Sequence, residues 1–440
     1  MSHPIYLNLI SFLGIWVFCL IAWLFSEHRQ IIPWRVIIGG ILLQLVLGFF
    51  VFQFPLTRAG LEIFSNLLNS VFLAADVGAN FVFGKNIVPL PDKPADINLG
   101  YIFAFRALPA IVFFSGLIGL LYSLGIIQII TNFFAKIFYK SMRLSGAEAL
   151  SGAANIFVGI EATIAVKPYI PKMTRSELCA ILSCCFGTVA SSTLALYVNF
   201  LKPVFPNILG HLVSASIMAI PACFVLSKIL VPETEIPLTS GGVPVEKQPE
   251  IDRETIPTET VGGELIERIS PMDAAILGAL DGVKMAVSIA AILILILGLV
   301  SLINQLLGGE TLQTILGVLF FPFTLLTGIP FNEAWIASVI IGRRLLETEI
   351  PSYFALAEAA AAGKISDRTI LIVSYALSGF AHIASIGIFV GGTIALAPSR
   401  RTDIAQLGWK ALFVGTLATL MIACIAGVYD TGNPSILGNT

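Results

Sequence analysis

The sequence predicts an all-α integral membrane protein, with about eight transmembrane helices and two re-entrant helical hairpins in an inverted repeat. Hydrophobic residues make up 57% of the 440 residues, and the mean hydropathy is +0.92. Charged residues make up only 12%, about half of the fraction that soluble proteins carry. In addition, apolar segments broken by polar residues recur in both halves of the chain, which indicates an internal repeat.

Eight apolar segments are each long enough to cross the hydrocarbon core of a bilayer. They lie near residues 6–25, 33–53, 101–124, 178–200, 207–230, 274–303, 369–393 and 406–429. His28, Arg29 and Arg35 fall between the first two segments, and positively charged loops stay in the cytoplasm. We therefore expect the N-terminus outside, and a multi-pass protein of the cytoplasmic (inner) membrane.

The stretches near residues 60–91, 126–171 and 312–365 do not behave as spans. Residues 231–270 are rich in Pro, Glu, Thr and Gly, with nine acidic and three basic side chains. Such a composition predicts a solvated linker without a folded domain.

Two of these unusual stretches resemble each other. In the first half, "SGAANIFVGIEATIAVKPYIPK" is followed by "MTRSE" and a span containing "FGTVASST". In the second half, "WIASVIIGRRLLETEIPSYFALAEA" is followed by "ISDRT" and a span containing "SGFAHIAS". Thr174 and Glu177 have the spacing of a capping box, and Ser366 can cap the equivalent helix. Paired, interrupted segments of this kind point to a transporter site at the interface of an inverted repeat.

The second of these segments is too charged to be an ordinary span. Arg343, Arg344, Glu347 and Glu349 place four charges in seven residues, which would cost on the order of 10 kcal/mol facing lipid. The apolar run before Gly342 covers only about 12 Å, less than half of the hydrocarbon core. A re-entrant hairpin with its tip in a polar cavity satisfies both observations. An interfacial loop with solvated charges remains the alternative, and Glu161 and Asn155 could form a satisfied structural polar pair.

No motif of an enzyme or a cofactor site is present. The chain lacks HExxH, GxSxG, GxGxxG and GxxxxGK patterns, and its six cysteines lie in apolar segments without CxxC spacing, as packing residues do. A net charge of -2 argues against nucleic acid as a partner. We expect no enzyme activity and no cofactor.

Several long strings resemble the concentrative nucleoside transporter family. They are "SEHRQIIPWRVIIGGILLQLVLG", "FAFRALPAIVFFSGLIGLLYSLG", "GAEALSGAANIFVG", "KPYIPKMTRSEL" and "SGFAHIASIGIFVGGTIALAPSRRTDIAQLGWKALFVGTLATL". The resemblance implies a homotrimer, with a scaffold and a moving transport part that carries two hairpins and two unwound helices. It also implies cation-coupled uptake of nucleosides, with sodium favoured over protons as the coupling ion.

With this resemblance, the chain divides into five parts. We expect residues 1–125 to form an N-terminal membrane part, 126–230 a first transport half with a hairpin near 146–171, 231–270 the hydrophilic linker, 271–311 a scaffold helix, and 312–440 a second transport half with a hairpin near 335–365.

The resemblance also implies a sodium site. Its ligands fall on Asn155, the Val158 carbonyl, Thr188 and the Val189 carbonyl. Several neutral oxygens suit a hard cation. The alternative for Asn155 and Thr188 is a hydrogen bond between helices.

On the sugar side of the substrate, the resemblance implies Glu349, Phe380, His382 and Ser385. Glu349 lies in "ETEIP", where the family usually has Asn-Glu-Phe, and His382 replaces an expected Asn. A carboxylate is a strong acceptor for sugar hydroxyls.

On the base side the resemblance implies Glu161 and Thr193. The family typically reads Gly-Gln-Thr-Glu at this tip, whereas this chain reads Gly159-Ile160-Glu161. One residue and both neutral polar partners of the base are lost, so we expect an altered base preference.

Three rival functions stay open at this stage. A membrane enzyme would need a catalytic constellation that the sequence does not offer. A channel or ion exchanger would share the intramembrane carboxylates without explaining the sugar-side resemblance, and an ion-coupled carrier of a different small polar solute is a further alternative. A sensor or regulatory relative would bind nucleosides without transporting them.

Overall fold

Helices make up nearly all of the regular structure. The computed structural model describes residues 5–53, 70–71, 73–90, 92, 95–97, 99, 102–106, 108–156, 159, 162–163, 166–167, 169–189, 191–240, 258–261, 264–267, 270–307, 311–433 and 436–438. The first half contains α1 (Ile5–Leu24), α2 (Trp34–Phe52), α4 (Phe103–Arg106), α5 (Leu108–Ser123), α6 (Ile126–Met142), α7 (Gly146–Ala154), α8 (Arg175–Gly187), α9 (Ser191–Leu201) and α10 (Ile208–Leu230). The second half contains α11 (Pro271–Leu307), α12 (Thr311–Leu326), α13 (Phe331–Glu347), α14 (Glu349–Ala361), α15 (Asp367–Ala376), α16 (Ile383–Leu396) and α17 (Arg401–Tyr429). The predicted all-α class is confirmed.

The expected spans fall into three groups. Among the described residues, five helices are long and apolar enough to cross a membrane, at Ile5–Leu24, Trp34–Phe52, Phe103–Ser123, Ile208–Leu230 and Pro398–Tyr429. The expected spans 178–200 and 369–393 are each two helices with a break, namely α8 with α9 and α15 with α16. The expected span 274–303 lies inside α11, a single helix of 37 residues.

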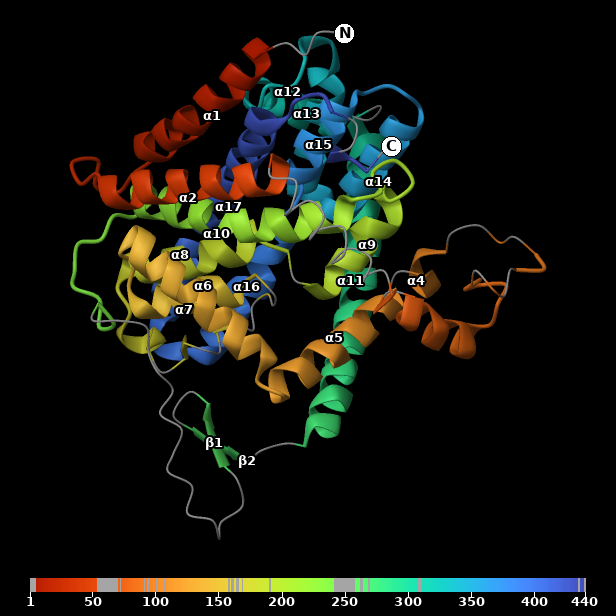
Figure 1. The fold of residues 1–440 in the computed structure, drawn as a ribbon, viewed down its shortest axis with the longest axis horizontal. Coiled ribbons are helices and arrows are strands. Elements are labelled where there is room, and N and C mark those ends of the chain that lie inside the picture. The colour runs from red at the N-terminus through yellow and green to blue at the C-terminus, as the bar shows by residue number, and fades with distance from the viewer. Residues whose placement is uncertain are drawn as a thin grey trace.

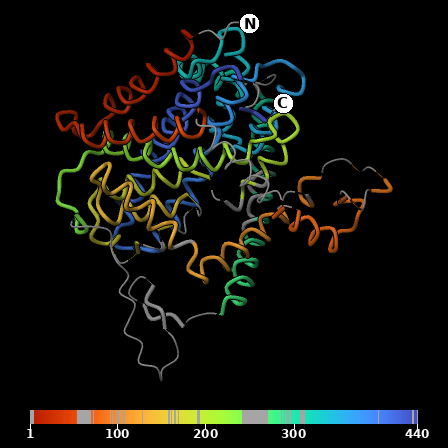
Figure 2. Tube along the Cα trace, in the orientation of Figure 1, coloured from red at the N-terminus to blue at the C-terminus, as the bar shows by residue number. Residues whose placement is uncertain are grey.

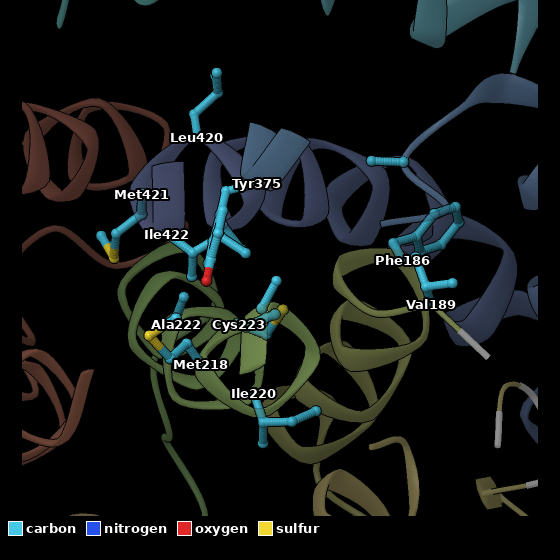
Figure 3. Packing of buried hydrophobic residues seen from close by; sticks show 14 of the residues in the cluster. Phe186, Val189, Met218, Ile220, Ala222, Cys223, Tyr375, Leu420, Met421 and Ile422 are labelled. Atoms are coloured by element: carbon cyan, nitrogen blue, oxygen red, sulfur yellow. The ribbon is translucent and has the colours of Figure 1, made fainter. Parts of the chain in front are cut away.

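The centre of the molecule is formed by α8, α10, α15 and α17. Nearly every residue of α10 is buried, as expected for a helix that is apolar on all sides. In Figure 3, Ala222 and Cys223 of α10 face Tyr375 of α15 and Ile422 of α17. Helices α5 and α11 pack against each other beside this core, and both the ribbon and the tube show them crossing (Figures 1 and 2).

Capping boxes fix the starts of α7 and α8, the two helices that flank residues 155–173. The predicted box of Thr174 and Glu177 is confirmed at the start of α8. A second box, of Ser145 and Glu148, begins α7 and was not predicted. Ser366 is the first residue before α15, but its hydroxyl binds Glu333 Oε2 at 2.8 Å and makes no capping bond.

The first residues of the expected linker, 231–240, are attached to the helices. Lys228 Nζ, at the end of α10, lies 2.6 Å from Glu148 Oε1 and 3.0 Å from Glu233 Oε2. Thr239 accepts hydrogen bonds from the first backbone N–H groups of α7, at 2.9 and 3.0 Å. The first N–H groups of a helix have no acceptor within the helix and must find one elsewhere. This part of the segment supplies it, so it is a structural connection and not a solvated linker.

Further along the same segment, β1 (Thr258–Val261) and β2 (Glu264–Glu267) form a short antiparallel pair, with Thr258 opposite Glu267. It lies apart from the helices in Figure 1. The composition of the segment did not indicate strands.

Glu27 connects the loop after α1 to three other helices. Its carboxylate accepts from Arg175 at the start of α8, with Nη2 at 2.9 Å, and contacts Lys410 of α17. Its backbone N–H donates to Leu230 O at the end of α10, at 2.9 Å. Burial alone would raise the pKa of Glu27, but hydrogen bonds and charges from Arg175 and Lys410 outweigh it and lower that pKa.

Candidate functional site

The second expected hairpin consists of α13 and α14, joined through one residue, Thr348. This residue has φ +77° and ψ 172°, a backbone conformation that is rare and costly for a β-branched side chain. Its buried hydroxyl has no hydrogen-bond partner among the described residues. Pro351 lies in the first turn of α14, where its fixed φ and missing N–H favour a helix start. The strained joint brings Glu349 to the first position of α14.

The charges of this hairpin are paired inside the protein, and all except the partly exposed Arg343 are buried. Arg343 Nη2 lies 2.8 Å from Glu347 Oε2, and Gln313 of α12 donates to Glu347 Oε1 at 2.7 Å. Arg344 is only 1% exposed. The cost estimated from the sequence is avoided because each of these side chains finds a partner inside the protein.

Arg344 stabilises the break after α15. Its Nη1 donates to the carbonyl of Ala376, the last residue of α15, and to Thr419 Oγ1 of α17 at 3.0 Å. A helix end leaves carbonyl groups unpaired and carries a partial negative charge, so a guanidinium there satisfies both. The hairpin is thereby anchored to the broken helix.

Glu349 is the centre of a buried polar cluster. Its Oε1 accepts from Tyr197 Oη of α9 at 2.7 Å, and its Oε2 lies 3.1 Å from His382 Nε2. The carboxylate is 3% exposed. Among the described residues, His382 is the partner of Oε2, and because a carboxylate oxygen has two lone pairs, one remains to accept a hydrogen bond from a ligand.

His382 has both ring nitrogens engaged at the start of α16. Nδ1 accepts from the backbone N–H of Ser385 at 3.3 Å and so caps the helix. This contact assigns the proton of the neutral ring to Nε2. Nε2 lies 2.8 Å from Ser385 Oγ and 3.1 Å from Glu349 Oε2. His382 therefore places the Ser385 hydroxyl and the Glu349 carboxylate beside each other.

Aromatic rings border this cluster. Tyr197 and Tyr353 stack with centroids 4.4 Å apart, and Tyr353 donates to Ser374 O at 2.9 Å. On the other side, the ring of Phe380 lies 6.4 Å from that of His382 and 6.1 Å from that of Phe389. Thr193 is buried one turn before Tyr197 on the same face of α9.

The two helix breaks contact each other directly. The N–H of Phe380, in the break between α15 and α16, donates to the carbonyl of Thr188, in the break between α8 and α9, at 3.3 Å. A side chain on Gly379 would lie 2.9 Å from the carbonyl oxygens of both Phe186 and Gly187. Only glycine allows the two breaks to approach this closely.

The described residues of the expected sodium site present unpaired oxygen. Asn155, at the end of α7, donates from Nδ2 to Ser151 O at 3.0 Å, while its buried Oδ1 has no hydrogen-bond partner among the residues described. Thr188 Oγ1 donates to Cys184 O at 2.8 Å and keeps its lone pairs. Val189 is buried in the break beside it. Amide, hydroxyl and carbonyl oxygens fit a hard cation.

The structure brings Glu349, His382 and Ser385 together, with Phe380 next to them. The expected sites Val158 and Glu161 lie outside the described residues. Tyr197, Tyr353 and Arg344 also shape the cluster and were not predicted as site residues. The sequence could have indicated Tyr197, because it lies one helical turn after Thr193, an expected site residue.

Comparisons with known proteins cover nearly the whole chain. Profiles of the Na+ dependent nucleoside transporter N-terminus and C-terminus match residues 13–86 and 211–427, and a nucleoside recognition profile matches residues 104–204. An uncharacterized transporter of Haemophilus influenzae is 37% identical, covering 95% of this chain and 97% of its own. The nucleoside permease NupC of Helicobacter pylori is 32% identical, covering 97% and 98%.

Solved structures of CNTnw have the same fold. Its inward-facing, substrate-bound state is 37% identical with a TM-score of 0.85, covering 97% of this chain and 98% of that one. A variant of CNTnw in an outward-facing state has a TM-score of 0.84 at 36% identity, covering 96% and 97%.

A helical hairpin and two broken helices that meet around buried polar groups define a multi-pass membrane transporter. The sequence matches place the chain within this class: it belongs to the concentrative nucleoside transporter family. The predicted family and the location in the cell membrane are confirmed. Membership in a transporter family is compatible with the expectation that the protein is not an enzyme.

Proposed function

We propose that the protein takes up nucleosides across the cell membrane, coupled to the entry of sodium. The single observation that supports this most is the buried Glu349 carboxylate, whose Oε2 atom lies 3.1 Å from His382 Nε2 and keeps a lone pair for a further hydrogen bond. A buried carboxylate is stabilised by additional donors, and a ligand with hydroxyl groups would supply them. A ribose presents adjacent hydroxyl groups.

In this proposal the sugar binds between α14 and the break before α16. Glu349 accepts from ribose hydroxyls, and Ser385 and His382 supply further polar atoms beside it. Tyr197 holds the Glu349 carboxylate through the 2.7 Å bond to Oε1. Oε1 is thereby engaged by Tyr197, and Oε2 accepts from the substrate beside its contact with His382.

The base binds towards Glu161 and Thr193, whereas Phe380 lies on the sugar side. An ionised Glu161 can only accept hydrogen bonds, so it favours bases with exposed N–H groups. With Ile160 in place of polar residues, we propose that purine nucleosides are accepted well.

Sodium binds at Asn155, the Val158 carbonyl, Thr188 and the Val189 carbonyl. The unpaired Oδ1 of Asn155 supports this placement. Thr188 belongs both to this set and, through its carbonyl, to the contact with Phe380.

We further propose the division into scaffold and transport parts, with residues 1–125 and 271–311 containing the scaffold helices, and residues 126–230 and 312–440 forming the two transport halves. CNTnw occurs in inward-facing and outward-facing states, and a similar motion would carry the site across the membrane. Many large apolar side chains of α11 are exposed, including Ile276, Leu280, Ile294 and Leu306. They fit contact with lipid or with neighbouring copies in a homotrimer.

Uptake by proteoliposomes tests the proposal. Radiolabelled adenosine, inosine, uridine and cytidine should enter faster with an inward sodium gradient than with a potassium gradient of equal strength. Competition by free ribose and free bases reports which half of the substrate is recognised. If no nucleoside is taken up and none competes, the substrate class is wrong. If uptake ignores sodium and follows a pH gradient, the coupling ion is wrong.

A further inference from the structure

A surface cavity of about 390 Å³ lies between the start of α2 and the end of α6. Its size falls within the range of small-molecule sites, roughly 300–1,000 Å³. The two helices approach closely here, since a Cβ on Gly39 would lie 2.5 Å from the Ser141 carbonyl oxygen. The cavity is separate from the cluster around Glu349 and from the expected sodium ligands.

Three cations line the cavity without partners. They are Arg35 of α2, Lys140 in the last turn of α6, and Arg143 directly after it. In the described part of the chain, their side chains make no ion pair or hydrogen bond. The described residues that line the cavity include no acidic side chain. Three convergent, unpaired cations indicate an anionic ligand, and guanidinium groups bind phosphate in a bidentate manner.

Arg143 is held at the cavity by an unfavourable backbone conformation. It has φ +52° and ends α6, a position where Gly or Asn is usual. A long charged side chain kept in such a conformation suggests a use for that side chain.

The position of the cavity distinguishes a lipid from a soluble anion. It lies where α2, a helix able to span the membrane, begins, and Trp34 in its wall is 58% exposed. Tryptophan prefers the boundary between headgroups and acyl chains. From the cavity, the exposed side chains Ile38, Leu42, Val46 and Phe49 follow one face of α2, at the three- and four-residue spacing of a helical stripe. This stripe offers an apolar surface for an acyl chain that continues from a bound headgroup.

We propose that this cavity binds the phosphate headgroup of an anionic phospholipid, with an acyl chain along the exposed face of α2. Arg35, Lys140 and Arg143 hold the phosphate, and Trp34 packs beside the glycerol. Arg35 belongs to the region expected in the cytoplasm, and anionic lipids attract basic groups on that side.

The first test measures lipid binding to the full-length protein in detergent. Phosphatidylglycerol should raise the melting temperature of the wild type, and phosphatidylcholine should not. The triple variant Arg35→Gln, Lys140→Gln, Arg143→Gln should lose at least about tenfold in phosphatidylglycerol affinity. The matched control, Lys136→Gln, Lys172→Gln, Lys364→Gln, removes the same charge from exposed lysines outside the cavity and should bind as the wild type does.

An equal loss of phosphatidylglycerol affinity in both triple variants would show that binding depends only on net charge, and would overturn the proposal. Glycerol 3-phosphate that stabilises the protein as well as the lipid does would show a soluble-anion site and overturn the choice of a lipid. A second measurement does not need the triple variant. Phosphatidylglycerol with brominated acyl chains should quench a fluorescence component that Trp34→Phe removes, and equal quenching by brominated phosphatidylcholine would contradict the proposal.

Discussion

Replacing Glu349 by glutamine should weaken nucleoside binding strongly while the protein still folds. Glutamine has nearly the same shape, and its carbonyl oxygen can still accept from Tyr197, as Oε1 does at 2.7 Å. The amide nitrogen then takes the place of Oε2 and presents donors to the sugar hydroxyls. A hydrogen bond to a charged acceptor contributes about 1.5–3 kcal/mol, so losing one corresponds to roughly a 10- to 150-fold loss of affinity.

Isothermal titration of purified protein with adenosine and uridine measures this loss, and the melting temperature checks that each variant is folded. Glu347→Gln is the matched control. It removes a buried carboxylate two residues away, but one that pairs with Arg343 and Gln313. Because Glu347 shares no partner with the cluster, the nucleoside affinity of the Glu347→Gln variant should stay within about twofold of the wild type. A folded Glu349→Gln protein with unchanged affinity, or equal losses in both variants, would refute the role of Glu349.

Four further outcomes are expected. Thr188→Val removes a sodium oxygen at constant shape and should raise the sodium concentration for half-maximal uptake, whereas an unchanged value would exclude this ligand. Glu27→Gln should lower the melting temperature at pH 7. Because the folded pKa of Glu27 is lowered, its stabilisation is present above about pH 4.3 and lost as the pH falls through the folded pKa. The melting temperatures of wild type and variant should therefore converge in acid, and a difference that stays constant with pH would contradict this. A Gly/Ser replacement of residues 241–257 should leave uptake within about twofold, and loss of assembly would reveal a structural role. Restoring a Gln-Thr tip in place of Ile160 should shift preference from purine towards pyrimidine nucleosides, and strict uridine selectivity of the wild type would contradict the argument from the short tip.

The parts of the site that follow from local rules could be predicted from the sequence. Four charges within residues 343–349 exclude a lipid-facing helix, and the spacing of Thr174 and Glu177 specifies a helix start. The partners of those charges could not be predicted. Tyr197 and Glu349 are 152 residues apart in the chain, and only the packing of α9 against α14 brings them together.

The attachment of residues 231–240 was missed for a similar reason. Composition describes how well a segment is solvated, but not whether a distant helix start needs acceptors. Thr239 supplies them to the start of α7, which lies more than eighty residues earlier in the chain.

The hydrogen bond from Phe380 to the Thr188 carbonyl has a thermodynamic consequence. The Thr188 carbonyl directly precedes Val189, an expected sodium ligand, and the Phe380 N–H belongs to the break that borders the sugar. A cation at the first break and a sugar at the second are therefore linked through this one hydrogen bond. Any free energy by which sodium strengthens nucleoside binding must equal that by which nucleoside strengthens sodium binding. The two titrations, each performed with and without the other ligand, must therefore give the same factor. Replacing the Phe380 N–H, for example by an ester linkage, should reduce both factors together.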